Sequence, residues 1–334
     1  MAVRDRIFEP GEVVAGRYRI VKELGRGSYG VVFEAEQMGI GRSVALKTLL
    51  PQTPGDSEES QRFEREALVV SRFNHPNIVT LFDYGEHEGV LFMVMEFVRG
   101  KELMELIEDE APLPAPRVRS IVLQMLDALQ YAHDKGVVHR DLKPENIQLL
   151  ESPTSEPGQE EMVKILDFGI AKFVHGEDEG SALDTLTQTG VAMGTPQYMS
   201  PENITGDPVT HHADIYAVGL LMYEMLTGEP AFKGKDPQAV MVSHLTDPPP
   251  VLGEGPQWRS FDRALEWSLR KQPDERAPQA RALAQVLEED APAVQASAGE
   301  APSKGSDGVT RALVAVVIAA VVVLVLLVAV VVRG

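Results

Sequence analysis

The chain has 334 residues, no cysteine and a formal net charge of -19, which comes from 50 acidic and 31 basic side chains. This negative charge excludes nucleic-acid binding by bulk electrostatic attraction, and the lack of cysteine excludes disulfides and thiolate metal sites. The length allows one large domain or two medium ones. Residues 1–17 begin without an apolar targeting segment, so we treat them as an N-terminal extension and expect no secretory signal.

Short β-branched runs dominate residues 18–97 and predict a small β-rich lobe. One amphipathic stretch, residues 59–73, predicts a helix among these strands. Glu66 lies beside the apolar stripe of that helix, so its side chain can face inward. The predicted strands cover residues 18–21, 31–33, 44–49, 78–82 and 91–97.

Helical spacing of apolar residues predominates in residues 98–289 and predicts a larger, mainly helical lobe. Gly228 follows one apolar stretch at the place where glycine commonly ends a helix. The predicted helices cover residues 118–133, 214–227, 263–269 and 277–287. The fold class is therefore α+β and bilobal, with a small antiparallel sheet and one helix in the N-lobe and a helical C-lobe.

The C-terminal part changes character twice. Residues 290–311 are rich in Ala, Pro, Ser and Gly without apolar periodicity, which predicts a flexible linker. Residues 312–332 are an uncharged run of Val, Leu, Ala and Ile. At about 1.5 Å per helical residue this run matches the roughly 30 Å hydrocarbon core of a bilayer, so it predicts one transmembrane helix rather than a buried core segment.

A glycine-rich segment after the first predicted strand has the pattern G-x-G-x-x-G-x-V. The residues that follow it continue as a strand, whereas a dinucleotide-binding turn leads into a helix. The pattern therefore predicts a hairpin whose backbone N–H groups approach phosphates, with apolar side chains on either side covering an adenine ring. The predicted nucleotide contacts here are Leu24, Gly25, Arg26, Gly27, Ser28, Tyr29, Gly30 and Val32.

Lys47 lies on a predicted strand and shares one face of that strand with Ala45. A lysine beside an apolar nucleotide slot needs a carboxylate partner, because its charge is partly removed from water. Glu66 is the helix residue best placed to provide this carboxylate, and Glu64 is the alternative.

Two further runs, residues 139–146 and 167–169, carry the groups needed for phosphoryl transfer. Asp141 provides a carboxylate that can accept or orient a hydroxyl, and Lys143 provides a charge for the γ-phosphate. Asn146 and Asp167 provide oxygen ligands for Mg²⁺, or for Mn²⁺ in its place.

Residues from about Tyr18 to Leu287 resemble the catalytic domain of the eukaryotic-like serine/threonine protein kinases found in bacteria. The segment His139-Arg140-Asp141, the segment Asp167-Phe168-Gly169 and the run 194–202 carry this resemblance. It implies that Met95 is the gatekeeper and that Glu96 and Val98 belong to the hinge that contacts adenine. The residues to which it assigns structural roles are His139, Arg140, Phe168, Thr195, Glu202, Asp214 and Arg276.

The resemblance implies an enzyme that uses ATP and Mg²⁺ to phosphorylate serine and threonine in proteins. Lys143 and Thr195 favour these hydroxyls over tyrosine. It also implies autophosphorylation of Thr185, Thr187 or Thr189, with a phosphate that pairs with Arg140. A nucleotide-binding pseudokinase scaffold and a small-molecule kinase are the alternatives. The acidic insertion 151–161 is interpreted as a surface loop rather than a docking site.

The predicted membrane helix implies a single-pass protein of the inner cell membrane, with a cytoplasmic kinase domain and almost nothing on the far side. Confinement to the membrane favours phosphorylation of neighbouring copies in trans. Ala315 and Ala319 are spaced so that two such helices can pack closely, which leaves a homodimer open.

Overall fold

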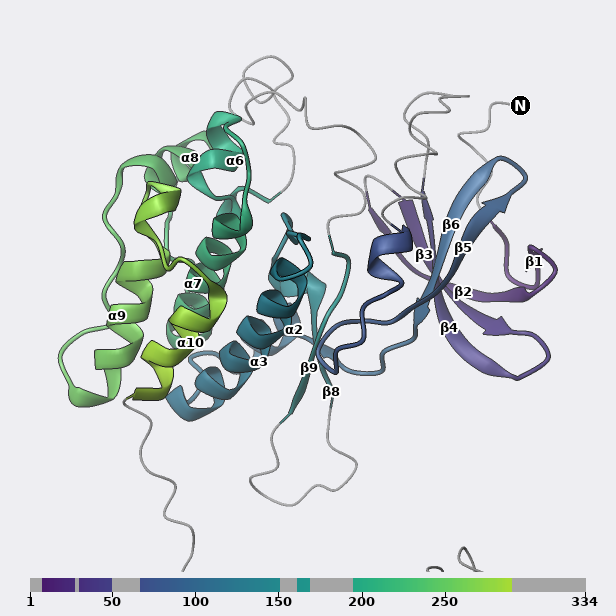
Figure 1. Ribbon diagram of the computed structural model, residues 1–334, viewed down its shortest axis with the longest axis horizontal. Helices are drawn as coiled ribbons and strands as arrows, with labels where there is room; N and C mark the ends of the chain where they lie inside the picture. Colours follow the sequence, from purple (N-terminus) through teal and green to yellow (C-terminus); the bar gives the residue numbers. More distant parts are fainter. Residues whose placement is uncertain (1–7, 28–29, 50–66, 151–160, 169–194, 290–334) are drawn as a thin grey trace, which may run out of the picture. The chain divides into compact units, whose positions relative to one another are not determined.

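The computed structural model describes residues 8–27, 30–49, 67–150, 161–168 and 195–289 (Figure 1). These residues lie within one compact unit, Met1–Asp290. Several predicted features lie outside the described residues: Glu66, its alternative Glu64, most of the insertion, the three threonines, the linker and the apolar run 312–332. Within the described ranges, no helix is both long and apolar enough to cross a membrane.

A six-stranded antiparallel sheet forms the N-lobe, in the spatial order β1-β2-β3-β4-β6-β5. It confirms the predicted β-rich lobe. The strands are β1 (Val13–Val14), β2 (Tyr18–Gly27), β3 (Gly30–Gln37), β4 (Arg42–Leu49), β5 (Leu81–His87) and β6 (Val90–Glu96).

The strand β1 belongs to the stretch predicted as an N-terminal extension. It pairs with the start of β2, and the backbone pairing continues from Gly11 N–H to the Ile20 carbonyl. Phe8 is buried and its ring lies 6.2 Å from that of Phe33. Part of the extension therefore completes the sheet and its core.

The two faces of the N-lobe sheet bury different side chains because successive residues of a strand point to opposite sides. One face carries a closed apolar cluster that includes Phe33, Val44 and Leu46. On the other face, Lys47 lies opposite Val32 and Met93, and Ala45 lies opposite Met95. This register brings the predicted nucleotide-facing residues of β3, β4 and β6 to one side of the sheet.

The C-lobe consists of helices and a small sheet, β7-β8-β9, whose strands β8 and β9 lie beside α3 (Figure 1). Its strands are β7 (Lys101–Glu102), β8 (Ile147–Leu150) and β9 (Met162–Ile165). The α-helices are α2 (Leu103–Glu110), α3 (Ala115–His133), α6 (Pro201–Thr205), α7 (His211–Thr227), α8 (Pro237–Thr246), α9 (Arg259–Ser268) and α10 (Ala280–Glu289). Short 3-10 helices are η2 (Pro144–Asn146), η3 (Pro196–Tyr198), η4 (Pro256–Trp258) and η5 (Pro273–Glu275). The bilobal α+β fold is thereby confirmed.

The predicted boundaries shift where tertiary contacts override local pattern. The strand predicted over 78–82 begins later, because Ile78 instead forms a parallel bridge with Ile165 at the free edge of β9. The helix α7 begins earlier than predicted, because the Thr210 hydroxyl accepts a hydrogen bond from the His212 N–H and caps it. Its end at Gly228, which has φ 75°, is as predicted.

Glu202 and Arg276 form a buried ion pair in the C-lobe, as the resemblance implied. Both guanidinium Nη atoms lie 2.7 Å from a Glu202 oxygen, and the side chains are 3% and 0% exposed. The remaining Arg276 donors bind the backbone carbonyls of Arg270, Lys271 and His212. A fully satisfied guanidinium thus ties the start of α6 to the start of α7 and to the loop before α10.

Replacing Arg276 with Met should destabilise the domain by about 3–5 kcal/mol, because the Glu202 carboxylate would stay buried without its cation. The measurement is urea unfolding monitored by circular dichroism. The matched control is Arg270→Met, which breaks an exposed pair with Glu266 and should cost about 1 kcal/mol or less. Equal unfolding midpoints for the two variants would contradict the expectation.

Candidate functional site

The loop between α3 and β8 brings Asp141 beside the predicted metal ligands. The side-chain amide of Asn146 donates to the Asp141 carbonyl oxygen at 2.7 Å and lies 3.4 Å from its Oδ2. The Asn146 carbonyl accepts a bond from the Leu166 N–H, immediately before Asp167. The short 3-10 helix η2 therefore brings the predicted base, Asp141, close to the two predicted metal ligands, Asn146 and Asp167.

Lys143 also lies at this point. Its Nζ is 3.4 Å from Asp141 Oδ2, and both side chains are only partly exposed. The ammonium group and the carboxylate thus face the same volume, as a group that binds phosphate and a group that orients a hydroxyl must.

Lys47 reaches this cluster from the N-lobe sheet. Its Nζ lies 2.6 Å from Asp167 Oδ2. The sequence predicted Glu66 as the partner of Lys47, and that residue lies outside the described part of the chain. The structure therefore brings Asp141, Asn146 and Asp167 together opposite Lys47, across the junction of the two lobes.

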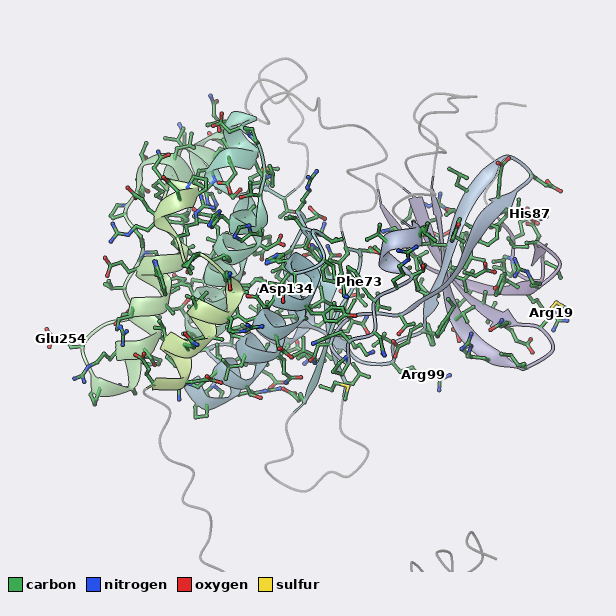
Figure 2. All side chains as sticks on the ribbon, in the orientation of Figure 1. Arg19, Phe73, His87, Arg99, Asp134 and Glu254 are labelled. Carbon is green, nitrogen blue, oxygen red and sulfur yellow. The ribbon has the colours of Figure 1, made fainter. Side chains whose placement is uncertain are left out.

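Phe168 anchors the segment that carries Asp167. Its ring is buried and packs edge-on against Phe73, at a centroid distance of 5.7 Å, and against His139 at 4.8 Å. Figure 2 shows Phe73 between the six-stranded sheet and the helices of the C-lobe. The His139 ring also bonds the Leu166 carbonyl at 2.8 Å, so aromatic packing and a hydrogen bond fix both sides of Asp167.

Asp214 holds the backbone of the catalytic loop, the segment from His139 to Asn146 that carries Asp141. Its carboxylate accepts the backbone N–H of His139 at 2.8 Å and that of Arg140 at 2.9 Å. His133, on α3, lies 2.7 Å from the same carboxylate. Burial raises the pKa of Asp214, but the His133 bond, the charges of His133 and His139 and the His139 N–H outweigh it, so the pKa is lowered overall.

Sequence reasoning missed His133 and the contact between Tyr198 and Glu224. The Tyr198 hydroxyl donates to Glu224 Oε2 at 2.9 Å and ties the segment after Thr195 to α7. Burial raises the pKa of both groups. Local spacing could predict neither contact, because His133 and Asp214 are 81 positions apart and Tyr198 and Glu224 are 26 positions apart.

The adenine end of the predicted site is apolar. Met95 is buried on β6, and Ala45 and Val32 lie on the same face of the sheet. Leu24 is 43% exposed on β2, as expected of a side chain that lines an open slot. Gly27 pairs with Gly30 across the hairpin, which confirms that the glycine-rich segment joins two strands; Ser28 and Tyr29 lie outside the described residues.

Other predicted nucleotide residues have partners of their own. Arg26 forms an exposed ion pair with Glu23, at 2.7 Å. The Glu96 side chain binds Lys164, whose Nζ lies 2.8 Å from Glu96 Oε2. A surface cavity of about 790 Å³ lies beside α9, near Glu254, which Figure 2 labels far from Phe73. Its lining contains no predicted site residue, so it does not define the nucleotide site.

The cluster suits Mg²⁺ carried by a nucleotide. Mg²⁺ typically takes one or two carboxylates from the protein and completes its shell with phosphate oxygens and water. Asp167 offers a carboxylate and Asn146 an amide oxygen on adjacent backbone segments. These two side chains are the residues that would hold the metal.

Three comparisons with known proteins bear on this site. The family described as the protein kinase domain matches residues 18–288. The serine/threonine-protein kinase pkn3 of Myxococcus xanthus is 41% identical over 283 residues, which are 83% of this chain and 50% of that protein. The serine/threonine-protein kinase PknD of Mycobacterium tuberculosis is 39% identical over 272 residues, 80% of this chain and 39% of that protein.

Among solved structures, the PknI kinase domain of Mycobacterium tuberculosis superposes with a TM-score of 0.63 at 28% identity. The match covers 86% of this chain and 100% of that one. The chain spans about half or less of the length of the curated relatives named above. The family match, these identities and the shared bilobal fold lead to one conclusion: this chain belongs to the bacterial serine/threonine protein kinase family.

Proposed function

We propose that this chain transfers the γ-phosphoryl group of MgATP to serine and threonine hydroxyls of proteins. The observation that carries the proposal is the convergence of Asp141, Asn146 and Asp167 on one point opposite Lys47. Bound Mg²⁺ would neutralise charge on the phosphates. The protein's share of the work is to position the reactants and to stabilise charge.

Each side chain has a role set by its place. Asp141 orients the incoming hydroxyl and accepts its proton, and Lys143 stabilises the charge on the transferred group. Lys47, now 2.6 Å from Asp167, holds the remaining phosphates when a nucleotide is present. Asn146 and Asp167 hold the metal. Ala45, Val32 and Met95 line the adenine slot on one face of the sheet.

The substrate class rests on Lys143 beside Asp141 and on Thr195 before η3, together with the names of the relatives. Thr195 comes directly before η3, Pro196–Tyr198. The hydrogen bond from Tyr198 to Glu224 ties this segment to α7, in the lobe that also carries the catalytic loop. This arrangement supports protein substrates over small molecules.

Asp141→Asn should lower turnover by at least about 100-fold, since a general base contributes roughly 10²–10⁴. The measurement is transfer of labelled phosphate from ATP to a generic serine- and threonine-containing protein, followed by identification of the phosphoamino acid. Nucleotide affinity, measured with a fluorescent ATP analogue, should stay within about threefold, because Asp141 faces the acceptor.

The matched control for this variant is Asp134→Asn, at the exposed end of α3. It should keep full turnover. A wild-type protein that binds the nucleotide but shows the same residual transfer as Asp141→Asn would instead indicate a pseudokinase scaffold.

We further propose activation by autophosphorylation at Thr187 and Thr189, with Thr185 as a third candidate. Arg140 supports this idea, because its backbone is fixed by Asp214 beside the catalytic aspartate. A phosphothreonine that pairs with its guanidinium would gain charge-assisted hydrogen bonds beside the catalytic aspartate.

Replacing Thr187 and Thr189 together with Ala should lower turnover at least tenfold, because one charge-assisted hydrogen bond is worth about 1.5–3 kcal/mol. Phosphatase treatment of the wild-type protein should have a similar effect, and incubation with MgATP should reverse it only in the wild type. Mass-spectrometric site mapping identifies the modified residue. Unchanged turnover in the double variant would refute this mode of activation.

The apolar run 312–332 supports a membrane-tethered kinase whose catalytic domain faces the cytoplasm and phosphorylates proteins held nearby, including other copies of itself. A homodimer through Ala315 and Ala319 belongs to the same proposal.

Deleting residues 312–332 should move the protein from the carbonate-washed membrane fraction to the supernatant, because about twenty apolar residues are what anchors it. Turnover on a soluble substrate should be unchanged. Recovery of the full-length protein in the supernatant would count against tethering, and equal crosslinking of the two forms would count against a dimer made by this segment.

A further inference from the structure

A partly buried ion pair lies at the end of β6, where the predicted hinge begins. Lys164 Nζ is 2.8 Å from Glu96 Oε2, and the two side chains are 9% and 30% exposed. The resemblance assigned Glu96 to nucleotide binding through the hinge and gave Lys164 no role. A lysine this deeply buried requires a charged partner, since isolated burial of the ammonium group is costly.

The pair is the centre of a small polar node that joins three segments. The Thr80 N–H donates to Glu96 Oε2 at 3.3 Å, and the Glu96 N–H donates back to the Thr80 carbonyl at 2.9 Å. Lys164 Nζ also lies 3.4 Å from the Ile78 carbonyl. The end of β6, the segment 78–80 and the strand β9 are therefore held at one place.

The node lies between the two ends of the nucleotide site. Glu96 is the last residue of β6 and the first residue of the predicted hinge, which continues to Val98. Lys164 lies three positions before Asp167 on a strand whose Ile165 exchanges backbone hydrogen bonds with residues on either side of Ile78. This contact thus joins the start of the hinge to the strand that leads to Asp167.

We propose that Lys164 is a positioning residue for nucleotide binding: through Glu96 it fixes the hinge relative to Asp167. The alternative is an ion pair that serves stability alone. Breaking a pair of that kind would lower the unfolding temperature but would leave the affinity of the folded protein for nucleotide unchanged.

The proposal rests on the proposed function, so its primary readout is binding rather than transfer. In Lys164→Met, the dissociation constant for ADP without added metal should rise about tenfold, as should the KM for ATP. The turnover number should change less than about threefold, because a displaced hinge weakens ground state and transition state alike. Lys164→Arg keeps the charge and should restore most of the affinity.

Coupling between the two residues provides a second test. Glu96→Gln should also weaken ADP binding. The double variant should bind ADP no more weakly than Lys164→Met, because each single variant already removes the same contact between Lys164 and Glu96. If Lys164→Met does not fold, Glu96→Gln decides the question, since its amide can still accept the Thr80 N–H. Full ADP affinity in Glu96→Gln would then overturn the proposal.

The matched control is Arg117→Met, which breaks another partly buried ion pair, with Glu161 at 2.6 Å, outside the nucleotide site. Its ADP affinity should equal that of the wild type even if its unfolding temperature falls. ADP affinity within twofold of wild type in Lys164→Met, or an equal loss in Arg117→Met, would overturn the proposal. Normal ADP binding by a wild type that transfers no phosphate would refute the kinase assignment and leave this inference intact.

Discussion

The site depends on one buried carboxylate. Asp214 is 1% exposed. Its carboxylate accepts hydrogen bonds from two backbone N–H groups of the catalytic loop and contacts the ring nitrogen of His133. The loop needs such a support because Arg140 has φ 65°, a left-handed conformation that costs a non-glycine residue about 1–2 kcal/mol. Asp167 has the same kind of backbone, with φ 50°, and is held by the packing of Phe168. Two strained positions therefore present the reactive groups, and buried contacts from other elements keep them there.

Much of this arrangement could be predicted because its signals are local. The residues from His139 to Asn146 lie within one loop, and Lys47 is placed by strand alternation, whereas the meeting of this loop with Asp167 and Lys47 was expected from the kinase motifs and the resemblance they carry. The alternation also predicted the sheet face that Ala45 and Lys47 share. The helix end at Gly228 followed from a single residue with the right backbone preference.

Other contacts could not be predicted because their partners are distant in sequence. Glu96 and Lys164 are 68 positions apart, and a glutamate at a strand end gives no indication of which lysine it will meet. The contribution of Phe8 to the N-lobe core was equally hidden, since a single aromatic residue in a charged segment has no periodicity. Thr210 shifted the start of α7 because a cap depends on one side chain rather than on a pattern.

The short strand β1 has a consequence for how the domain can be isolated. It covers the start of the outer edge of β2, whose backbone groups there would otherwise be open to pairing with another chain. The family match starts at Tyr18, after this cover. A fragment cut at that boundary would lose Phe8 from its core and would present a bare edge strand, which invites self-association. A fragment that keeps the folded unit intact should therefore begin at or before Phe8, ahead of the first residue of the family match.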